Sequence, residues 1–135
     1  MFNKTELGYV QAGGLTRLAR MATVGSDGQP IVDAVGYTYA DGTFTVGTHH
    51  GDVLATRKGR NVKEGRKHVS LIVDDVESVD PWLPRGIRVQ GEAEVVEIDG
   101  HFGRGAYLMI RPTRTWSWGL EGSVFELGTH RTDWA

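Results

Sequence analysis

A dense group of basic residues in the middle of the chain is the first candidate for chemistry. Between residues 57 and 67 a single acid, Glu64, stands among Arg57, Lys58, Arg60, Lys63, Arg66 and Lys67. The whole chain has a formal net charge of -2, so this positive charge is local. A local cluster in a chain without an overall basic bias favours a site for one anionic group over a surface for a long polyanion. A phosphate group is the first candidate.

Length and composition limit the classes of protein that need to be considered. The chain has 135 residues, which suits one domain, 1–135, with its own core. It has no cysteine, which excludes disulfides, thiolate zinc sites, iron–sulfur clusters and thiol nucleophiles. The N-terminus lacks a basic segment followed by an apolar one, and no apolar run approaches the ~20 residues of a membrane span. We therefore expect a soluble, cytoplasmic protein that does not contact a membrane.

The first third of the chain predicts one helix and three strands. Asn3 is a good N-cap with Glu6 at the capping-box position, and the glycines at 13–14 end the helix. Residues 15–24 alternate, with Leu18, Ala22 and Val24 on one face, which predicts a strand. Residues 31–39 and 43–48 predict two more strands, joined by a hairpin turn at residues 41–42. These three strands are expected to form an antiparallel meander.

The remainder predicts a second helix and a set of longer strands. Asp52 is a plausible N-cap for a helix that stops near Gly65, and Gly59 inside it suggests a close approach to the backbone. Residues 68–74 are almost continuously apolar, as expected of a central strand buried on both faces. Residues 80–86 are expected to be irregular, and 87–98 to form a strand that ends at a turn at 99–100. Segments 106–110 and 115–120, separated near Pro112, are expected to close the sheet, and residues after 120 are left unassigned.

These elements favour a mainly β fold. Six to seven short antiparallel strands with two short helices are most simply a small closed barrel. Such a barrel is filled by its own side chains, because an interior cavity begins to open only at about eight strands. A sizeable ligand is therefore expected to bind outside the barrel.

Four spaced motifs carry a resemblance to a known family. They are LARMATV at 18–24, TRKGRNV at 56–62, VDD at 73–75 leading to DPWLPRG at 80–86, and SWGL at 117–120. The chain resembles the split β-barrel flavin and deazaflavin oxidoreductases, the pyridoxamine-phosphate-oxidase-like superfamily. It is most similar to the branch that uses the deazaflavin coenzyme F420, and within it to a short subfamily that includes a reductase of tetracycline biosynthesis. Residues 49–52 (HHGD) depart from the usual pattern of that branch.

The resemblance implies a homodimer with cofactor grooves between the two chains. By matching position, Arg57, Lys58 and Asn61 would hold the cofactor phosphate and Thr48 would flank it. The facing subunit would contribute Trp82, Pro84 and Arg85, and Trp118 would line the same groove. The implied reaction is hydride transfer from reduced F420, with FMN as the alternative cofactor, to an electron-poor C=C bond of a small organic substrate.

The sequence contains no motif that indicates a dedicated catalytic acid or base. Tyr37, His49 or His50 could protonate a substrate if they faced the cofactor ring. Adjacent histidines on a strand point to opposite faces, so we expect no metal site at His49 and His50. The acids at 74, 75 and 77 are expected to be solvated.

Other functions stay open on the same barrel. A non-catalytic protein that carries or stores FMN, F420 or haem is the main alternative to a reductase. Nucleic-acid binding is disfavoured, because no aromatic residue lies between residues 57 and 67. Trp82 could be a packing anchor instead of a cofactor contact, and Trp116 is expected to be buried at the barrel or dimer interface.

Overall fold

The computed structural model of the chain describes residues 1–49 and 52–135, so the roles considered for His50 and Gly51 lie outside the described residues. The strands are β1 (Ala19–Val24), β2 (Pro30–Val35), β3 (Thr38–Ala40), β4 (Thr43–Val46), β5 (His68–Ser78), β6 (Leu83–Gly100), β7 (Gly103–Trp118) and β8 (Thr129–Asp133). The α-helices are α1 (Lys4–Ala12), α2 (Arg57–Lys63) and α3 (Val124–Leu127), and a 3₁₀ helix, η1 (Val53–Ala55), precedes α2. Mainly β structure is thus confirmed, with more elements than predicted.

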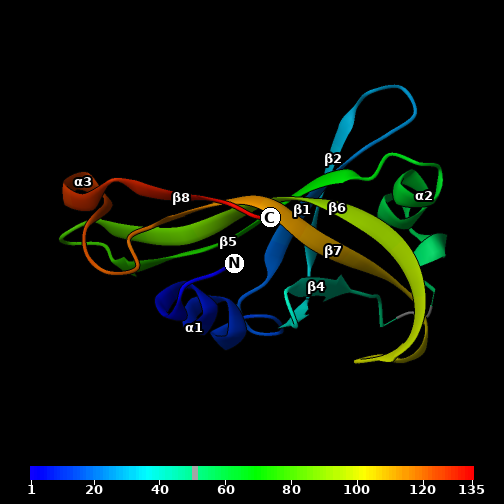
Figure 1. Cartoon of the computed structure of the whole chain (residues 1–135), viewed down its shortest axis with the longest axis horizontal. Helices are drawn as coiled ribbons and strands as arrows, with labels where there is room; N and C mark the ends of the chain where they lie inside the picture. Colours follow the sequence, from blue (N-terminus) through cyan, green and yellow to red (C-terminus); the bar gives the residue numbers. More distant parts are fainter. Residues whose placement is uncertain (50–51) are drawn as a thin grey trace.

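All the strands belong to one antiparallel sheet. Its order is β2-β1-β5-β6-β7-β4-β3. Strand β8 pairs with the C-terminal part of β7, from Arg114 to Trp118. The two strands at the ends of this path, β2 and β3, are not paired with each other in the described residues. The sheet is therefore curved but open between these two strands, which confirms the split β-barrel implied by the resemblance; the closed barrel favoured by the strand count alone is not found in the described residues. Helix α2 lies at one end of the long axis, and α3 with the β5–β6 hairpin lies at the other (Figure 1).

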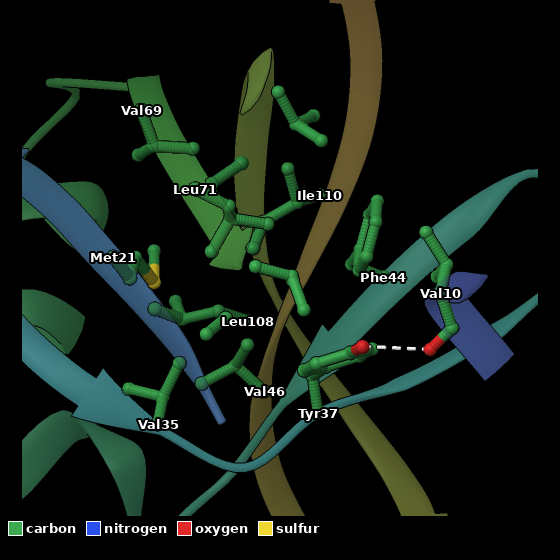
Figure 2. Packing of buried hydrophobic residues seen from close by; sticks show 14 of the residues in the cluster. Val10, Met21, Val35, Tyr37, Phe44, Val46, Val69, Leu71, Leu108 and Ile110 are labelled. Carbon is green, nitrogen blue, oxygen red and sulfur yellow. Dashed lines mark hydrogen bonds between the residues drawn. The ribbon is translucent and has the colours of Figure 1, made fainter. Parts of the chain in front are cut away.

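The concave side of the sheet holds one hydrophobic core. Alternate residues of five strands point into it, and each is at most 1% exposed: Met21, Val46, Leu71, Val89 and Leu108. Figure 2 shows Met21, Val46, Leu71 and Leu108 converging from their different strands. Helix α1 docks at the edge of this core through Val10, whose carbonyl accepts a 2.6 Å hydrogen bond from the Tyr37 hydroxyl. Side chains fill the interior, as expected for a barrel of this size.

Helix α1 confirms its predicted caps. The Asn3 side chain accepts from the Glu6 N–H at 2.8 Å, and the Glu6 carboxylate accepts from the Asn3 N–H at 2.9 Å. The helix ends with Gly13 as C-cap. Within the described residues, no helix has the length and apolar character needed to cross a membrane.

The first strand has the opposite face inward from the one that the apolar pattern suggested. Ala19, Met21 and Thr23 are the buried residues of β1, whereas Leu18 and Val24 are 40% and 37% exposed. A one-residue offset in a strand exchanges its two faces, so Thr23 inside and Val24 outside reverse the expected order. Thr23 tolerates burial because its hydroxyl accepts a hydrogen bond from Asn61.

The predicted meander is also wrong. Segment 31–39 breaks at Gly36 and Tyr37 into β2, which pairs with β1, and β3, which pairs with β4. The hairpin at Asp41 and Gly42 is confirmed, and both residues have positive φ, 52° and 79°, as a tight two-residue turn requires.

The predicted second helix is two consecutive helices. Asp52 caps η1, and Thr56 caps α2 with its hydroxyl accepting from the Gly59 N–H at 3.2 Å. Gly59 does permit a close backbone approach, because a Cβ there would lie 2.0 Å from the Val53 carbonyl oxygen. The approaching group is therefore the preceding turn of the same chain.

Strands β5 to β8 extend further than the sequence indicated. The central position of β5, between β1 and β6, is confirmed, but its burial alternates instead of covering both faces. Strand β6 already begins at Leu83, so half of the segment expected to be irregular is strand. Segment 106–110 and residues 115–118 of the other predicted segment belong to the single strand β7, in which a register shift beside Gly91 accommodates Pro112; residues 119–120 lie beyond its end. The unassigned tail forms α3 and β8.

Candidate functional site

Helix α2 presents basic side chains that have no acidic partner among the described residues. In the part of the chain that the structure describes, no ion pair involves Arg57, Lys58, Arg60 or Lys63. The two basic residues that follow the helix are neutralised, since Arg66 pairs with Glu64, and Lys67 with Glu92 at 3.7 Å. Within the basic cluster at residues 57–67, the charge without an acidic partner among the described residues therefore lies on the seven residues of α2.

The helical repeat divides these four cations between two sides. Arg57, Arg60 and Lys63 recur at every third position and are exposed. Lys58 precedes the buried Val62 by four residues, so it lies on the sheet-facing side, where it is only half-exposed. Arg60 donates to the Ala55 carbonyl at 3.0 Å, which brings its guanidinium back toward the start of the helix. This arrangement suits a multiply charged oxyanion, because guanidinium supplies a planar fork of donors and ammonium a compact charge.

Asn61 holds α2 against the sheet. Its side chain is 2% exposed and donates from Nδ2 to the Thr23 hydroxyl at 3.0 Å. Arg66 donates from Nε to the Val24 carbonyl at 2.8 Å and approaches Asn61 Oδ1 at 3.5 Å. The amide is therefore committed to protein contacts in this structure. Its predicted contact with the phosphate stays a prediction.

Thr48, the predicted flank of the phosphate, lies just beyond β4 and is half-buried. The β4 end of the chain path and α2 lie on the same side of the molecule in Figure 1. The structure thus brings Thr48, Arg57, Lys58 and Asn61 toward one end of the long axis.

The other predicted residues gather at the opposite end. Trp82 occupies the turn between β5 and β6 and is 51% exposed, so it is not a buried packing anchor. Pro84 pairs with Val76 across the sheet. Trp118 pairs with Gly86, where a Cβ would lie 2.7 Å from the indole Cζ2, so the glycine makes room for the ring.

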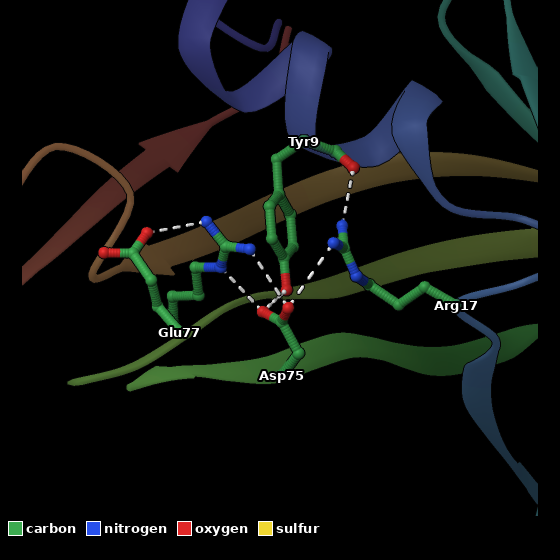
Figure 3. A network of polar contacts seen from close by, with 5 residues as sticks. Tyr9, Arg17, Asp75 and Glu77 are labelled. Atoms are coloured by element: carbon green, nitrogen blue, oxygen red, sulfur yellow. Dashed lines mark hydrogen bonds and ion pairs between the residues drawn. The ribbon is translucent and has the colours of Figure 1, made fainter. Parts of the chain in front are cut away.

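Arg85 is the centre of a polar network at this end (Figure 3). Its guanidinium donates twice to Asp75, at 2.7 and 3.1 Å, and once to Glu77 at 2.8 Å. Asp75 also accepts from the Tyr9 hydroxyl at 2.8 Å and pairs with Arg17 at 3.4 Å. Of the acids expected to be solvated, Asp74 and Glu77 are exposed as expected, whereas Asp75 is half-buried within this network. The network joins α1, the following loop, β5 and β6.

The network shifts the pKa values of its members. The hydrogen bonds from Arg85 hold the pKa of Asp75 below its usual value, with Tyr9 and Arg17 adding to the effect. Burial raises the pKa of the Tyr9 phenol, and its hydrogen bond to Asp75 raises it further. The charge of Arg85 is therefore neutralised by two carboxylates, whereas the four cations of α2 have no acidic partner in the described residues.

Two further candidates can be placed. Burial raises the pKa of Tyr37 to about 12, and its only proton is donated to the Val10 carbonyl. Tyr37 is 4% exposed and lies in the core, so it is not available to donate a proton to a substrate.

His49 is exposed, with its ring centroid 6.1 Å from that of Phe102. No group of three metal-ligating side chains occurs among residues 1–49 and 52–135.

Trp116 lies on the outer face of β7 and is half-buried, with the Arg88 guanidinium 4.4 Å above its ring. Its predicted burial in a dimer interface stays a prediction. The roles of Tyr9 and Arg17 could not be predicted from the sequence, because both residues contact Asp75 only in the folded chain.

The two groups of candidate residues are far apart in one chain. Strand β5 runs from the α2 end to the β5–β6 hairpin, and its eleven residues span about 35 Å at roughly 3.3 Å per residue. One cofactor ring with its phosphate cannot contact both ends of the same chain.

The described residues form a curved antiparallel sheet whose two end strands do not pair with each other, with a basic helix after the fourth strand, and this architecture is that of the split β-barrel proteins. The sequence profile described as pyridoxamine 5'-phosphate oxidase matches residues 15–117, and the chain belongs to this family. A relative from Streptomyces rimosus, 5a,11a-dehydrotetracycline/5a,11a-dehydrooxytetracycline reductase, is 32% identical over 98% of this chain and 92% of its own. The family and this relative place the chain among oxidoreductases.

Solved structures share the fold at lower identity. An F420 reductase matches with a TM-score of 0.63 and 18% identity, over 84% of this chain and 98% of its own. A heme binding protein from Mycobacterium smegmatis matches with a TM-score of 0.69 and 17% identity, over 98% of this chain and 59% of its own.

Proposed function

We propose that the protein is a reductase that uses the reduced deazaflavin coenzyme F420 to transfer a hydride to an electron-poor C=C bond of a small organic molecule. The observation that carries the cofactor assignment is the set of four basic side chains on α2 that have no acidic partner in the described part of the chain. The reductase from Streptomyces rimosus, at 32% identity over almost the whole chain, supports the reaction class.

The residues present fit a phosphate-bearing cofactor. Arg57 and Lys58 would hold the phosphate, and Arg60, turned toward the same end of the helix by its bond to Ala55, would assist them. Lys63 is the next cation along the helix and is available for further acidic groups of the cofactor. Arg66 and Arg85 are less suited to that role, since each is already paired with carboxylates.

The bound cofactor would supply the hydride, and the protein would supply orientation, charge and exclusion of water. In the overall reaction one alkene carbon gains the hydride and the other a proton, and F420 is left oxidised. Within the described residues Tyr37 is excluded as the source of that proton, because its hydroxyl is buried and donates to Val10. Solvent, or His49 on the exposed surface, remains as the source.

The separation of the two groups of candidate residues supports a groove built from two chains. The α2 end of one subunit would bind the phosphate, and Trp82, Pro84 and Trp118 of a second copy would cover the ring. Arg85 would then act by fixing the hairpin that carries Trp82, through its bonds to Asp75 and Glu77. A homodimer with two such grooves follows from two-fold symmetry.

The reaction can be tested with the substrate of the relative. Purified protein is mixed anaerobically with reduced F420 and 5a,11a-dehydrotetracycline, and oxidised deazaflavin is followed by its absorbance and the reduced product by mass spectrometry. We expect stoichiometric oxidation and reduction that depend on the protein. A parallel reaction with reduced FMN tests the alternative cofactor. Turnover with FMN alone would overturn the F420 assignment, and no turnover with any activated alkene would favour a carrier of FMN, F420 or haem.

A further inference from the structure

A pocket of about 210 Å³ opens beside the tip of the β6–β7 hairpin. Its walls come from the turn of that hairpin, from β3 and β4, and from the loop that follows α1. The tip of the hairpin, drawn in yellow, lies at the same end of the long axis as α2 (Figure 1). The pocket is therefore on the side of the molecule that carries the proposed phosphate site.

The strand residues that line the pocket point to the same face of the sheet. Phe44 and Val46 are fully buried in the core, so Thr45 between them points to the outer face. Its cross-strand partner Thr38 points the same way. Tyr107 lies between two core residues of β7 and also points outward. These side chains therefore form one surface, on the opposite side of the sheet from the hydrophobic core.

Tyr107 lines the pocket and is held in one orientation. Its hydroxyl accepts from the Phe102 N–H at 2.9 Å and donates to the Gly103 carbonyl at 2.6 Å. A Cβ at Gly47 or at Gly100 would lie 2.4 Å from a carbon of the ring, so both glycines make room for it. The tyrosine is only 3% exposed although it faces away from the core. It therefore offers a fixed aromatic surface to a ligand.

The rim of the pocket carries exposed apolar side chains and an imidazole. Phe102 is 42% exposed and Leu15 is 55% exposed. The ring of His101 also lines the pocket, with its centroid 4.9 Å from that of Phe102. Asp99 adds a carboxylate, which disfavours an anionic ligand. The pocket therefore combines apolar walls with a hydrogen-bonding group at its mouth.

The size of the pocket limits what it can take. An apolar cavity of about 150 Å³ holds benzene, and sites that enclose drug-sized ligands begin at about 300 Å³. The volume of about 210 Å³ therefore suits one ring or two small fused rings. A carbonyl conjugated with a C=C bond makes that bond electron-poor and supplies an acceptor for an imidazole N–H.

We propose that this pocket is the substrate subsite of the reductase and takes a flat, neutral ring that carries a carbonyl conjugated with the C=C bond. Phe102 and Tyr107 lie against the ring, and His101 donates to the carbonyl oxygen. This inference rests on the proposed function, since the ligand is taken to be the substrate of that reaction. The hydrogen bond also withdraws electron density from the C=C bond, which favours addition of a hydride.

The test uses two small probes that differ in the carbonyl group. 1-Indanone and indane are titrated into ¹⁵N-labelled protein, and the amide shifts are followed. 1-Indanone is expected to shift the amides of Gly47, Gly100 and Phe102, which surround the Tyr107 ring. Indane should bind at least about threefold more weakly, because it cannot accept a hydrogen bond.

Phe102→Ala tests the aromatic wall. Only the backbone N–H of Phe102 bonds to Tyr107, so the variant keeps that contact and loses the ring. Its affinity for both probes should fall by about fivefold. Phe125→Ala removes an exposed phenyl ring from α3 and should bind both probes like the wild type.

His101→Phe tests the hydrogen bond to the carbonyl. It keeps an aromatic ring at the rim and removes the donor, so the preference for 1-indanone over indane should disappear. His130→Phe makes the same change in β8, outside the wall of this pocket, and should keep the preference. Equal affinity of the wild type for the two probes, or equal effects within either pair of variants, would overturn the inference.

The titration is repeated with protein saturated with oxidised F420. A substrate subsite should still bind 1-indanone, whereas displacement of the probe by F420 would show that the pocket takes the deazaflavin ring and would overturn the inference. A protein that binds F420 but not the probe would remove only the substrate subsite. A protein that binds the probe but not F420 would overturn the proposed function and, with it, the assignment of the pocket to the reductase substrate.

Discussion

At the scale of single residues, the contrast between paired and unpaired cations distinguishes the two ends of the molecule. Arg85 is neutralised by Asp75 and Glu77, whereas Lys58 has no acidic partner in the described residues. Like charges three positions apart on a helix destabilise it by a few tenths of a kcal/mol per pair. A bound anion would remove that repulsion, so the charge pattern of α2 fits ligand binding better than it fits stability of the free protein.

Replacing Asp75 tests the network at the other end. Asp75→Asn should lower the free energy of unfolding at pH 7 by about 1–3 kcal/mol, because Arg85 and Arg17 lose their shared carboxylate. Urea denaturation measures the change. Asp74→Asn is the matched control, because its partner Arg20 is exposed, and it should cost less than about 1 kcal/mol.

Asp75→Asn should also change how the free energy of unfolding depends on pH. The folded state lowers the pKa of Asp75 from its ordinary value of 3.8, so its stabilising contribution is complete above that value and is lost as the pH falls below it. The wild type should therefore lose stability more steeply than Asp75→Asn as the pH falls below about 4, toward the lower pKa that Asp75 has in the folded state. Parallel stability curves for the two proteins would show that the network does not hold Asp75 ionised.

At the scale of elements, the sequence predicted helix caps and hairpin turns correctly, because local backbone geometry determines them. The cap at Asn3 and Glu6 and the hairpin at Asp41 and Gly42 follow from hydrogen bonding and positive φ, and both are confirmed. Periodicity alone failed for β1, because Thr23 is buried by a partner on α2 that is 38 residues away. Sequence reasoning also could not find that Tyr9 meets Asp75, 66 residues away, since only the fold brings them together.

Glycine substitutions test the packing of α2 on η1. Gly59→Ala should destabilise the protein even though alanine favours helix, because its Cβ would lie 2.0 Å from the Val53 carbonyl oxygen. Gly8→Ala in α1 is the matched substitution, since nothing lies within 4 Å of the new Cβ, and it should stabilise by about 0.5–1 kcal/mol. Thermal unfolding compares the two variants. A stabilising Gly59→Ala would mean that α2 is not held against η1 as described.

At the scale of the whole molecule, the account requires two chains for each cofactor. A mixing experiment tests this with Lys58→Glu, which damages the α2 end, and Trp82→Glu, which damages the hairpin end. Each variant alone should bind F420 poorly. In co-refolded mixtures, about a quarter of the grooves should be intact, because random pairing in two-fold dimers gives one intact groove per mixed dimer.

Light scattering on the same samples establishes whether they are dimers. If the groove lies within one chain, every subunit in the mixture still carries one defect and no binding returns. That outcome would remove the two-chain groove and leave the phosphate site on α2 to be judged separately.

The most direct test of the central claim is a parallel equilibrium titration of the purified protein with F420, FMN and haem, followed by tryptophan fluorescence and cofactor absorbance. The account predicts tight, selective F420 binding that Lys58→Gln weakens by about 1.5–3 kcal/mol, roughly 10- to 150-fold. Lys67→Gln, which removes a cation already paired with Glu92, should leave the affinity nearly unchanged. Selective binding of FMN or haem, or equal effects of the two lysine substitutions, would contradict it.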